Sequence, residues 1–152
     1  MKRLLLLTAI FLGGCIDVDV QMDKGSPSVT PTETISIYID NFNNADIKLL
    51  NETTASPFFW LRGTERNVYD SYGDSVDFDG LRSDGWSYSK INSLELIYED
   101  PETSMVNMNF SRYGGDDQVI LTASANYLLI NYDGIWKIKG GFAPTNVSTG
   151  QD

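Results

Sequence analysis

The sequence predicts an α+β domain in which helices pack on one face of a strongly curved antiparallel sheet. Two observations lead to this fold class. Apolar residues recur at helical spacing just after residue 30, and from residue 86 onward they alternate along runs that turn signals separate. Helices that come first and consecutive hairpins that follow are typical of α+β folds.

The first helix is predicted to begin at Pro31. Thr30 precedes it as N-cap, and Glu33 lies three residues further on, so the segment has a capping box with proline at the first helical position. The face that the helix buries is expected to consist of Ile35, Tyr38, Ile39, Phe42 and Ala45.

A short second helix is predicted after Asp46, which acts as its cap, with Leu49 and Leu50 facing inward. Ser56-Pro57 breaks this helix, and the apolar run 58–61, FFWL, is predicted to be a short buried strand. Residues 64–85 are ambiguous. A third helix over this segment would be lined by Tyr69, Tyr72, Val76 and Leu81, but Gly73 and Gly80 argue against it.

Four strands are predicted over residues 91–99, 105–113, 119–132 and 135–142. The loop 114–117, GGDD, joins the second to the third, and Asp133-Gly134 predicts a type I′ hairpin before the fourth. Alternation assigns one face of each strand to the core. These faces comprise Leu94, Leu96 and Tyr98; Val106, Met108 and Phe110; the odd positions from Val119 to Leu129; and Trp136, Ile138 and Phe142.

This order resembles the NTF2-like (SnoaL-like) superfamily over residues 30–142. The resemblance lies in the opening helix, the short second helix, the FFWL strand and the closing pair YLLINYDGIWKIKGGF. It implies a cystatin-like cone whose mouth holds a ligand pocket. It also implies that the domain can form a homodimer through the sheet.

The first fifteen residues, MKRLLLLTAIFLGGC, resemble the lipobox signal peptide of bacterial lipoproteins. The resemblance implies removal of residues 1–14 and acylation of Cys15. Residues 15–29 are then expected to form an acidic tether, and residues 143–152 a polar tail. Ile16 follows the cysteine where inner-membrane lipoproteins commonly have Asp, which favours the periplasmic face of the outer membrane, although Asp17 and Asp19 leave the inner membrane open.

Composition excludes several function classes. The formal net charge is −10, and it becomes −12 when Lys2 and Arg3 are removed with the signal, so nucleic-acid binding is not expected. Membrane contact should come from the acyl chains rather than from a basic patch. The chain has no histidine, which removes Ser-His-Asp and Cys-His catalysis and the usual zinc ligands. No cofactor is predicted.

Arg112 is the first candidate site residue. Alternation places it on the apolar side of its strand, where an unpaired guanidinium is costly. It is interpreted either as a clamp for an anion or carboxylate at the pocket mouth, or as a structural residue. The structural alternatives are an ion pair with Asp40 or Glu95, or a strand end in solvent.

Aromatic residues form the second candidate set, and they serve either the core or a pocket for an apolar ligand. The ligand-binding candidates, chosen because they are amphipathic, are Tyr38, Trp60, Tyr88 and Tyr127.

Acidic residues provide two weaker candidates. The cluster 70–84 contains Asp70, Asp74, Asp77, Asp79 and Asp84 but lacks the glutamate that closes a calcium loop, so no metal site is predicted. Asp40, beside Tyr38, is the weak candidate for a catalytic base.

The leading functional hypothesis is a lipid-anchored envelope protein whose non-catalytic domain binds a small apolar or anionic ligand, or a protein partner, in the cone mouth. The first alternative is a small cofactor-free isomerase, dehydratase or cyclase that uses Asp40 as base. The second alternative is a dimeric scaffold without a ligand.

Overall fold

The computed structural model describes residues 29–151. The predicted signal segment, Cys15 and the tether as far as residue 28 lie outside these residues. None of the helices within 29–151 is long and apolar enough to cross a membrane.

Helix α1 (Pro31–Asn43) begins as its capping box predicts: the Thr30 hydroxyl accepts from the Glu33 amide at 3.2 Å, and the Thr30 amide donates to Glu33 at 2.8 Å. Its predicted buried stripe is confirmed from Ile35 to Phe42, whereas Ala45 lies beyond the helix end.

Helix α2 (Ile47–Thr53) is capped by Asp46 and buries Leu50 completely. The expectation for Leu49 was wrong, because its side chain is 40% exposed. Adjacent helical positions are about 100° apart, so a short helix that points Leu50 at the core turns Leu49 toward solvent.

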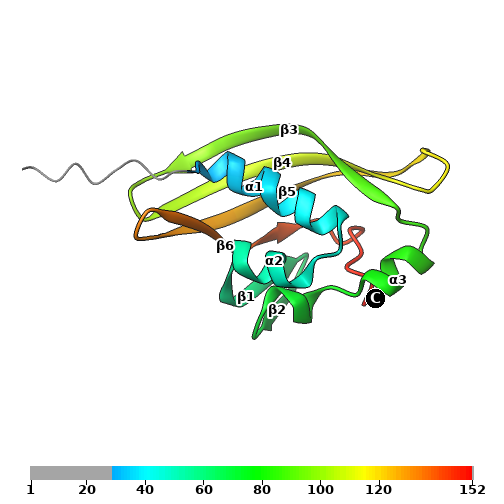
Figure 1. The fold of residues 1–152 in the computed structure, drawn as a ribbon, viewed down its shortest axis with the longest axis horizontal. Helices are drawn as coiled ribbons and strands as arrows, with labels where there is room; N and C mark the ends of the chain where they lie inside the picture. The colour runs from blue at the N-terminus through cyan, green and yellow to red at the C-terminus, as the bar shows by residue number, and fades with distance from the viewer. Residues whose placement is uncertain (1–28, 152) are drawn as a thin grey trace, which may run out of the picture.

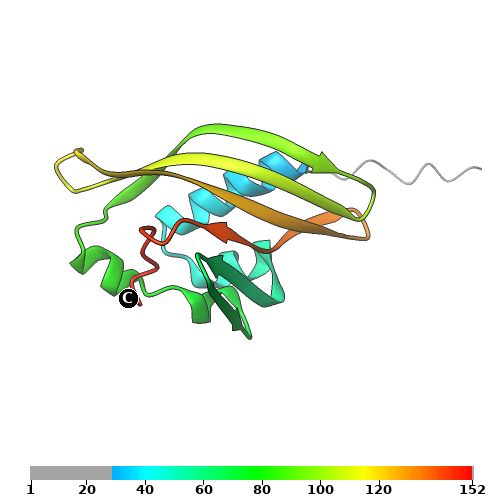
Figure 2. The same ribbon diagram turned by 180° about the vertical axis from the view of Figure 1, so that it is seen from behind.

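Six strands form one curved sheet in the order β2-β1-β6-β5-β4-β3. Their bounds are β1 (Thr54–Arg62), β2 (Glu65–Tyr69), β3 (Tyr88–Glu99), β4 (Thr103–Tyr113), β5 (Val119–Tyr132) and β6 (Ile135–Ala143). The sheet is mixed, because β1 and β6 run parallel and the other pairs antiparallel. Figures 1 and 2 show α1 crossing one face of this sheet, with α2 beside it.

Residues 64–85 do not form one helix. They form β2, a 3-10 turn (η1, Tyr72–Ser75) and helix α3 (Phe78–Ser83). Tyr69 therefore lies on a strand, although Tyr72, Val76 and Leu81 are buried as expected. Ser71 with Asp74, and then Asp77, cap two separate short turns, and these local hydrogen bonds interrupt a continuous helix.

Strand register confirms most predicted inward positions. Val106, Met108 and Phe110 are buried, and so is β5 from Ala123 to Leu129 at odd positions. The type I′ hairpin is confirmed, since Asp133 and Gly134 have φ values of 51° and 91°.

Two inward assignments near strand ends were wrong. Tyr98 pairs with Met105 on the outer face, because β3 has a bulge between Leu96 and Tyr98. Phe142 is 43% exposed, because a bulge in β6 places both Ile138 and Gly141 on the inner face. An extra residue at a bulge reverses the alternation beyond it. Leu96 lies on the inner face as predicted but is 46% exposed, and Val119 is 54% exposed.

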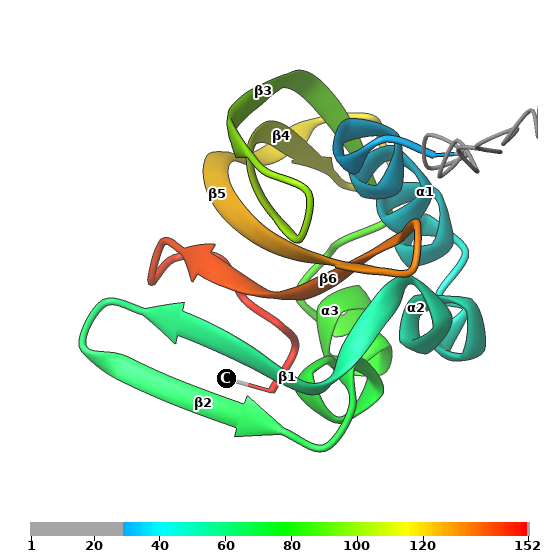
Figure 3. The same cartoon turned by 90° about the vertical axis from the view of Figure 1, so that its left-hand side faces the viewer.

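The chain after β6 folds back under the sheet toward α3, and Figure 3 shows it passing between β1 and α3. We call residues 144–151 the C-terminal strap. Val147 in the strap is buried, and the Asp77 amide donates to the Thr149 carbonyl at 2.8 Å. The predicted polar tail is thus packed against the domain and closes one end of its core.

Candidate functional site

A cavity of about 40 Å³ lies between α1, the inner face of the sheet and the C-terminal strap. Its polar lining residues are Tyr38, Trp60, Arg62, Tyr72, Ser89, Arg112, Tyr127 and Thr149. Apolar side chains such as Ile39, Met108 and Phe110 complete the wall. No carboxylate lines the cavity among the residues that the structure describes.

Arg112 lies on strand β4 and points toward this cavity, because the alternation that buries Phe110 also turns Arg112 inward. The side chain is 8% exposed. Its Nη1 donates to the Ser148 carbonyl oxygen at 2.7 Å. Its Nε is buried and has no hydrogen-bond partner among residues 29–151.

The surroundings of the Arg112 guanidinium are aromatic. The guanidinium carbon lies 5.8 Å from the ring centre of Phe42 and 5.9 Å from that of Phe110, which is within cation–π range. Burial lowers the pKa of Arg112, the nearby Arg62 lowers it further, and the neighbouring tyrosines oppose this shift. Arginine remains charged in proteins, so a buried positive charge faces the cavity.

Three tyrosines surround this charge. The hydroxyl oxygens of Tyr38 and Tyr72 are 2.8 Å apart in a hydrogen bond, and the ring centres of Tyr38 and Tyr127 are 5.4 Å apart. Desolvation raises the pKa of all three tyrosines. Their hydroxyls therefore stay protonated at neutral pH, and one hydroxyl of the Tyr38–Tyr72 pair already donates to the other.

Arg62 is the second basic residue of the lining. It comes from the end of β1 and is half-buried. Its Nη2 donates to the Thr145 carbonyl oxygen of the C-terminal strap at 3.3 Å. The cavity thus combines two cations and several hydroxyl donors within a protein whose formal net charge is −10.

The family model described as NTF2-like protein (DUF6841) matches residues 32–145. The chain belongs to this family. None of the curated proteins compared with this NTF2-like chain matches it significantly.

Solved structures share the fold of this NTF2-like domain at low identity. An NTF2-like protein with a cystatin-like fold from Novosphingobium aromaticivorans is 12% identical, with a TM-score of 0.59, over 74% of this chain and 77% of that one. A provisionally assigned dehydratase of the NTF2-like family from Streptomyces avermitilis is 11% identical, with a TM-score of 0.57, over 76% and 92%. A provisionally assigned ketosteroid isomerase from Shewanella frigidimarina is 10% identical, with a TM-score of 0.54, over 72% and 89%.

The NTF2-like cone brings together four of the residues that the sequence singled out. Arg112, Tyr38, Trp60 and Tyr127 line the same cavity. Tyr88 does not. Its ring stacks on that of Tyr113, with 4.9 Å between the ring centres, and its hydroxyl donates a hydrogen bond to the Asp117 carboxylate. Its place in the register opposite Tyr113 puts it on the outer face, one residue out of phase with the inward Ser89.

Neither acidic partner considered for Arg112 approaches it. Asp40 is exposed on α1, and Glu95 pairs with the outer-face residue Asn107. Arg112 is also buried, so it is not a strand end in solvent. Asp40 is absent from the cavity lining, and no other described carboxylate takes the place of a general base there.

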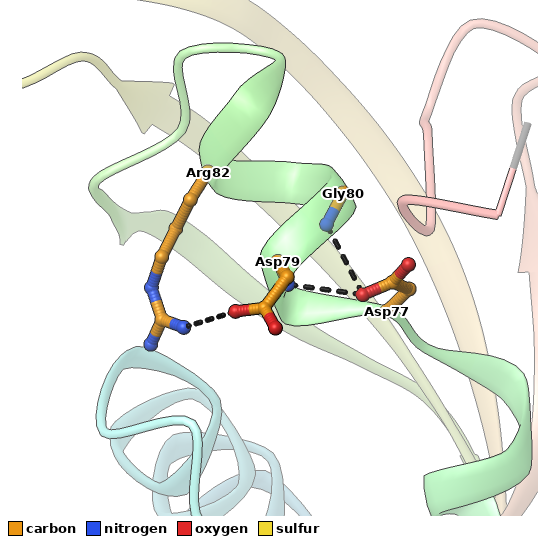
Figure 4. A network of polar contacts seen from close by, with 4 residues as sticks. All are labelled: Asp77, Asp79, Gly80 and Arg82. Atoms are coloured by element: carbon orange, nitrogen blue, oxygen red, sulfur yellow. Dashed lines mark hydrogen bonds and ion pairs between the residues drawn. The ribbon is translucent and has the colours of Figure 1, made fainter.

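The acidic cluster 70–84 stabilises local turns. The Asp77 carboxylate accepts from the amides of Asp79 and Gly80 at 3.0 and 3.1 Å, and Asp79 pairs with Arg82 at 3.3 Å (Figure 4). Within residues 29–151, no group of three or more metal-binding side chains is placed to hold an ion.

Sequence reasoning missed Tyr72, Arg62 and the C-terminal strap. Tyr72 was assigned only to a helix, although its hydroxyl completes the tyrosine cluster. Arg62 follows the predicted FFWL strand by one residue, so a longer strand would have pointed to it. The strap carries only one buried apolar side chain, Val147, and gives no periodic signal.

Proposed function

We propose that this NTF2-like domain binds a small organic carboxylate at Arg112 and does not catalyse a reaction. The observation that carries the proposal is a buried guanidinium that faces a cavity and has no carboxylate partner among the described residues. A guanidinium presents a planar fork that matches a carboxylate with two parallel hydrogen bonds.

Energetics support a ligand for Arg112. Removing a cation from water costs several kcal/mol unless good hydrogen bonds compensate, and Arg112 makes one hydrogen bond, to a neutral carbonyl. An incoming carboxylate would supply the charge and the acceptors that the folded chain does not. Tyr38 and Tyr72 line the same cavity, and because one of their hydroxyls donates to the other, the pair has one hydroxyl hydrogen left for the ligand.

Cavity size sets the class of ligand. A buried water needs about 10–15 Å³, so about 40 Å³ accommodates about three waters or one carboxylate group. Apolar neighbours such as Phe42 and Val76 favour a short hydrocarbon chain on that group. Acetate and propionate are the simplest probes of this class.

The catalytic alternative has no supporting contact. A carbonyl isomerase or dehydratase of the expected kind needs a desolvated carboxylate as base, and Asp40 is exposed on α1. The two provisionally assigned enzymes among the similar structures are 10–11% identical, so they support the fold and not the chemistry.

One observation favours the second alternative, a scaffold without a ligand. The cavity, at about 40 Å³, is far smaller than the roughly 300–1,000 Å³ typical of small-molecule pockets.

For the cellular setting, we propose that Cys15 is acylated and holds the domain in a bacterial envelope, on the periplasmic face of the outer membrane. This rests on the lipobox-like residues MKRLLLLTAIFLGGC and on Ile16.

The test compares thermal unfolding in sodium acetate or propionate with unfolding in sodium chloride at the same ionic strength. At 100 times its dissociation constant, a ligand stabilises the folded state by about 2.7 kcal/mol, which corresponds to several degrees in Tm. We expect this shift for the wild type and for Arg66→Met, whose arginine is exposed on β2, and its loss in Arg112→Met.

The stability of Arg112→Met separates binding from a structural role. Without a ligand, the variant should be as stable as the wild type or more stable, by about 0–2 kcal/mol, because it removes an unpaired buried charge. A loss of more than about 3 kcal/mol would assign Arg112 a structural role. A wild type with no carboxylate-specific shift would favour the scaffold.

A further inference from the structure

The C-terminal strap, residues 144–151, contacts Arg112 at the edge of the cavity. The carbonyl oxygen of Ser148 accepts from Arg112 Nη1 at 2.7 Å. Val147 and Thr149, on either side of Ser148, form part of the cavity wall. The strap therefore supplies one acceptor oxygen to the guanidinium and forms part of the wall of the space in front of it.

Close backbone packing holds the strap against α3. The Asp77 amide donates to the Thr149 carbonyl at 2.8 Å, and the Gln151 side chain donates to the Asp74 carbonyl at 2.9 Å. Gly150 has φ +83°, and a Cβ added to it would collide with the Asp77 carbonyl oxygen. A side chain at position 150 is thus excluded both by conformation and by space.

Apart from these bonds and the bonds from Arg62 to Thr145 and from Arg112 to Ser148, few contacts keep the strap in place. Val147 is its only buried hydrophobic residue, and the remaining strap residues from Pro144 to Gln151 are partly or fully exposed. Segments with few buried apolar contacts open with low free energy while the rest of the fold remains intact. Helix α1 and the central strands, which supply Tyr38, Tyr127 and Arg112, have no such weakness, because they carry the core.

We infer that the C-terminal strap is a displaceable lid whose Ser148 carbonyl competes with a carboxylate ligand for Arg112. The inference rests on the proposed function, because it assumes that a carboxylate binds there. On entry, Arg112 gives up one hydrogen bond to a neutral carbonyl and gains charge-assisted bonds to a carboxylate. The released strap frees the Asp77 amide and moves Val147 and Thr149 away from the cavity.

Competition by the strap lowers the apparent affinity in proportion to the fraction of molecules with the strap open. A change that weakens docking of the strap therefore tightens ligand binding without touching Arg112 or the tyrosines. Gly150→Ala is such a change. Gly115→Ala is its matched control, because Gly115 lies in the exposed β4–β5 loop, where an added Cβ meets nothing within 4 Å.

The experiment titrates the full-length protein with sodium acetate and follows backbone amide hydrogen exchange of Asp77. We expect Gly150→Ala to lower the apparent dissociation constant for acetate roughly tenfold, as for an open fraction near one in ten in the wild type, and Gly115→Ala to leave it unchanged. In the wild type, acetate should speed exchange of the Asp77 amide, a readout that requires no variant to fold.

Two results would count against the proposals in distinguishable ways. If acetate stabilises the wild type but leaves exchange at Asp77 unchanged, and Gly150→Ala binds acetate no more tightly, the lid is refuted and carboxylate binding stands. If acetate affects neither the wild type nor Gly150→Ala, the carboxylate site itself is refuted, and the lid with it.

Discussion

Arg112 shows what alternation along one strand can predict and what it cannot. Because β4 is regular, period two placed Arg112 on the same side as Phe110, and the structure buries it there. The hydrogen-bond partner of Arg112 could not be predicted from the sequence. The acceptor is a backbone carbonyl 36 residues away, and every residue type has such a carbonyl.

The three cavity tyrosines lead to a prediction about alkaline pH. Burial raises the pKa of Tyr38, Tyr72 and Tyr127 above the ordinary value of 10. When the pH is raised and ionisation is followed by ultraviolet absorbance, at most five of the eight tyrosines should therefore ionise while the protein stays folded. All eight should ionise in the protein unfolded by urea.

The same shift determines the sign of the pH dependence. The folded pKa values lie above the unfolded ones, so the stabilising contribution is complete below pH 10 and is lost as the pH rises toward the folded values. The free energy of unfolding should fall above pH 10. Ionisation of all eight tyrosines with unchanged far-ultraviolet circular dichroism would contradict this assignment.

At the scale of elements, bulges decide which side chains reach the core. The bulge between Leu96 and Tyr98 in β3 and the bulge in β6 each reverse the alternation, and they turn Tyr98 and Phe142 outward. The extra residue in a bulge is set by the local pairing of two strands, and a one-residue shift moves all later side chains to the other face. Periodicity in a single strand carries no information about such a shift.

The β3–β4 hairpin depends on Asp100, which accepts hydrogen bonds from the Tyr98 and Thr103 hydroxyls and from the amides of Glu102 and Thr103. These bonds, that from Tyr98 most of all, lower the pKa of Asp100 to about 2. Its contribution to stability is therefore present above the unfolded value of 3.8 and is lost as the pH falls toward 2.

Substitution of Asp100 tests this contribution. Asp100→Asn should lower Tm at neutral pH, and its difference from the wild type should narrow as the pH is lowered from 5 toward 2. Asp133→Asn is the control, because asparagine also adopts the left-handed conformation of that turn. A difference between Asp100→Asn and the wild type that does not change with pH would show that the Asp100 carboxylate does not stabilise the hairpin through its charge.

At the scale of the whole molecule, the net charge and the proposed lipid anchor set the context of the site. A formal net charge of −10 disfavours contact with phosphate backbones and anionic lipid, while the cavity contains Arg62 and Arg112 and no described carboxylate. We propose that the domain approaches a membrane through acyl chains on Cys15 rather than through basic residues.

The proposed acylation of Cys15 predicts where the protein fractionates. The wild type should be recovered with membranes and released by detergent, whereas Cys15→Ser should lose nearly all of this association because it has no acyl acceptor. Recovery of Cys15→Ser with membranes would contradict acyl anchoring.

Native mass spectrometry of the wild type, purified from its own cells in detergent, would report a retained carboxylate and the oligomeric state together.

The sequence by itself determined the fold class, the start of α1, the central strands and the inward direction of Arg112. These features depend on local hydrogen bonds and on periodicity, which neighbouring residues encode. Only the tertiary structure decided that β1 and β6 pair in parallel, that Tyr72 joins Tyr38, and that the C-terminal strap closes on Arg112. These contacts join segments tens of residues apart, several of them through backbone atoms, so no local pattern in the sequence could specify them.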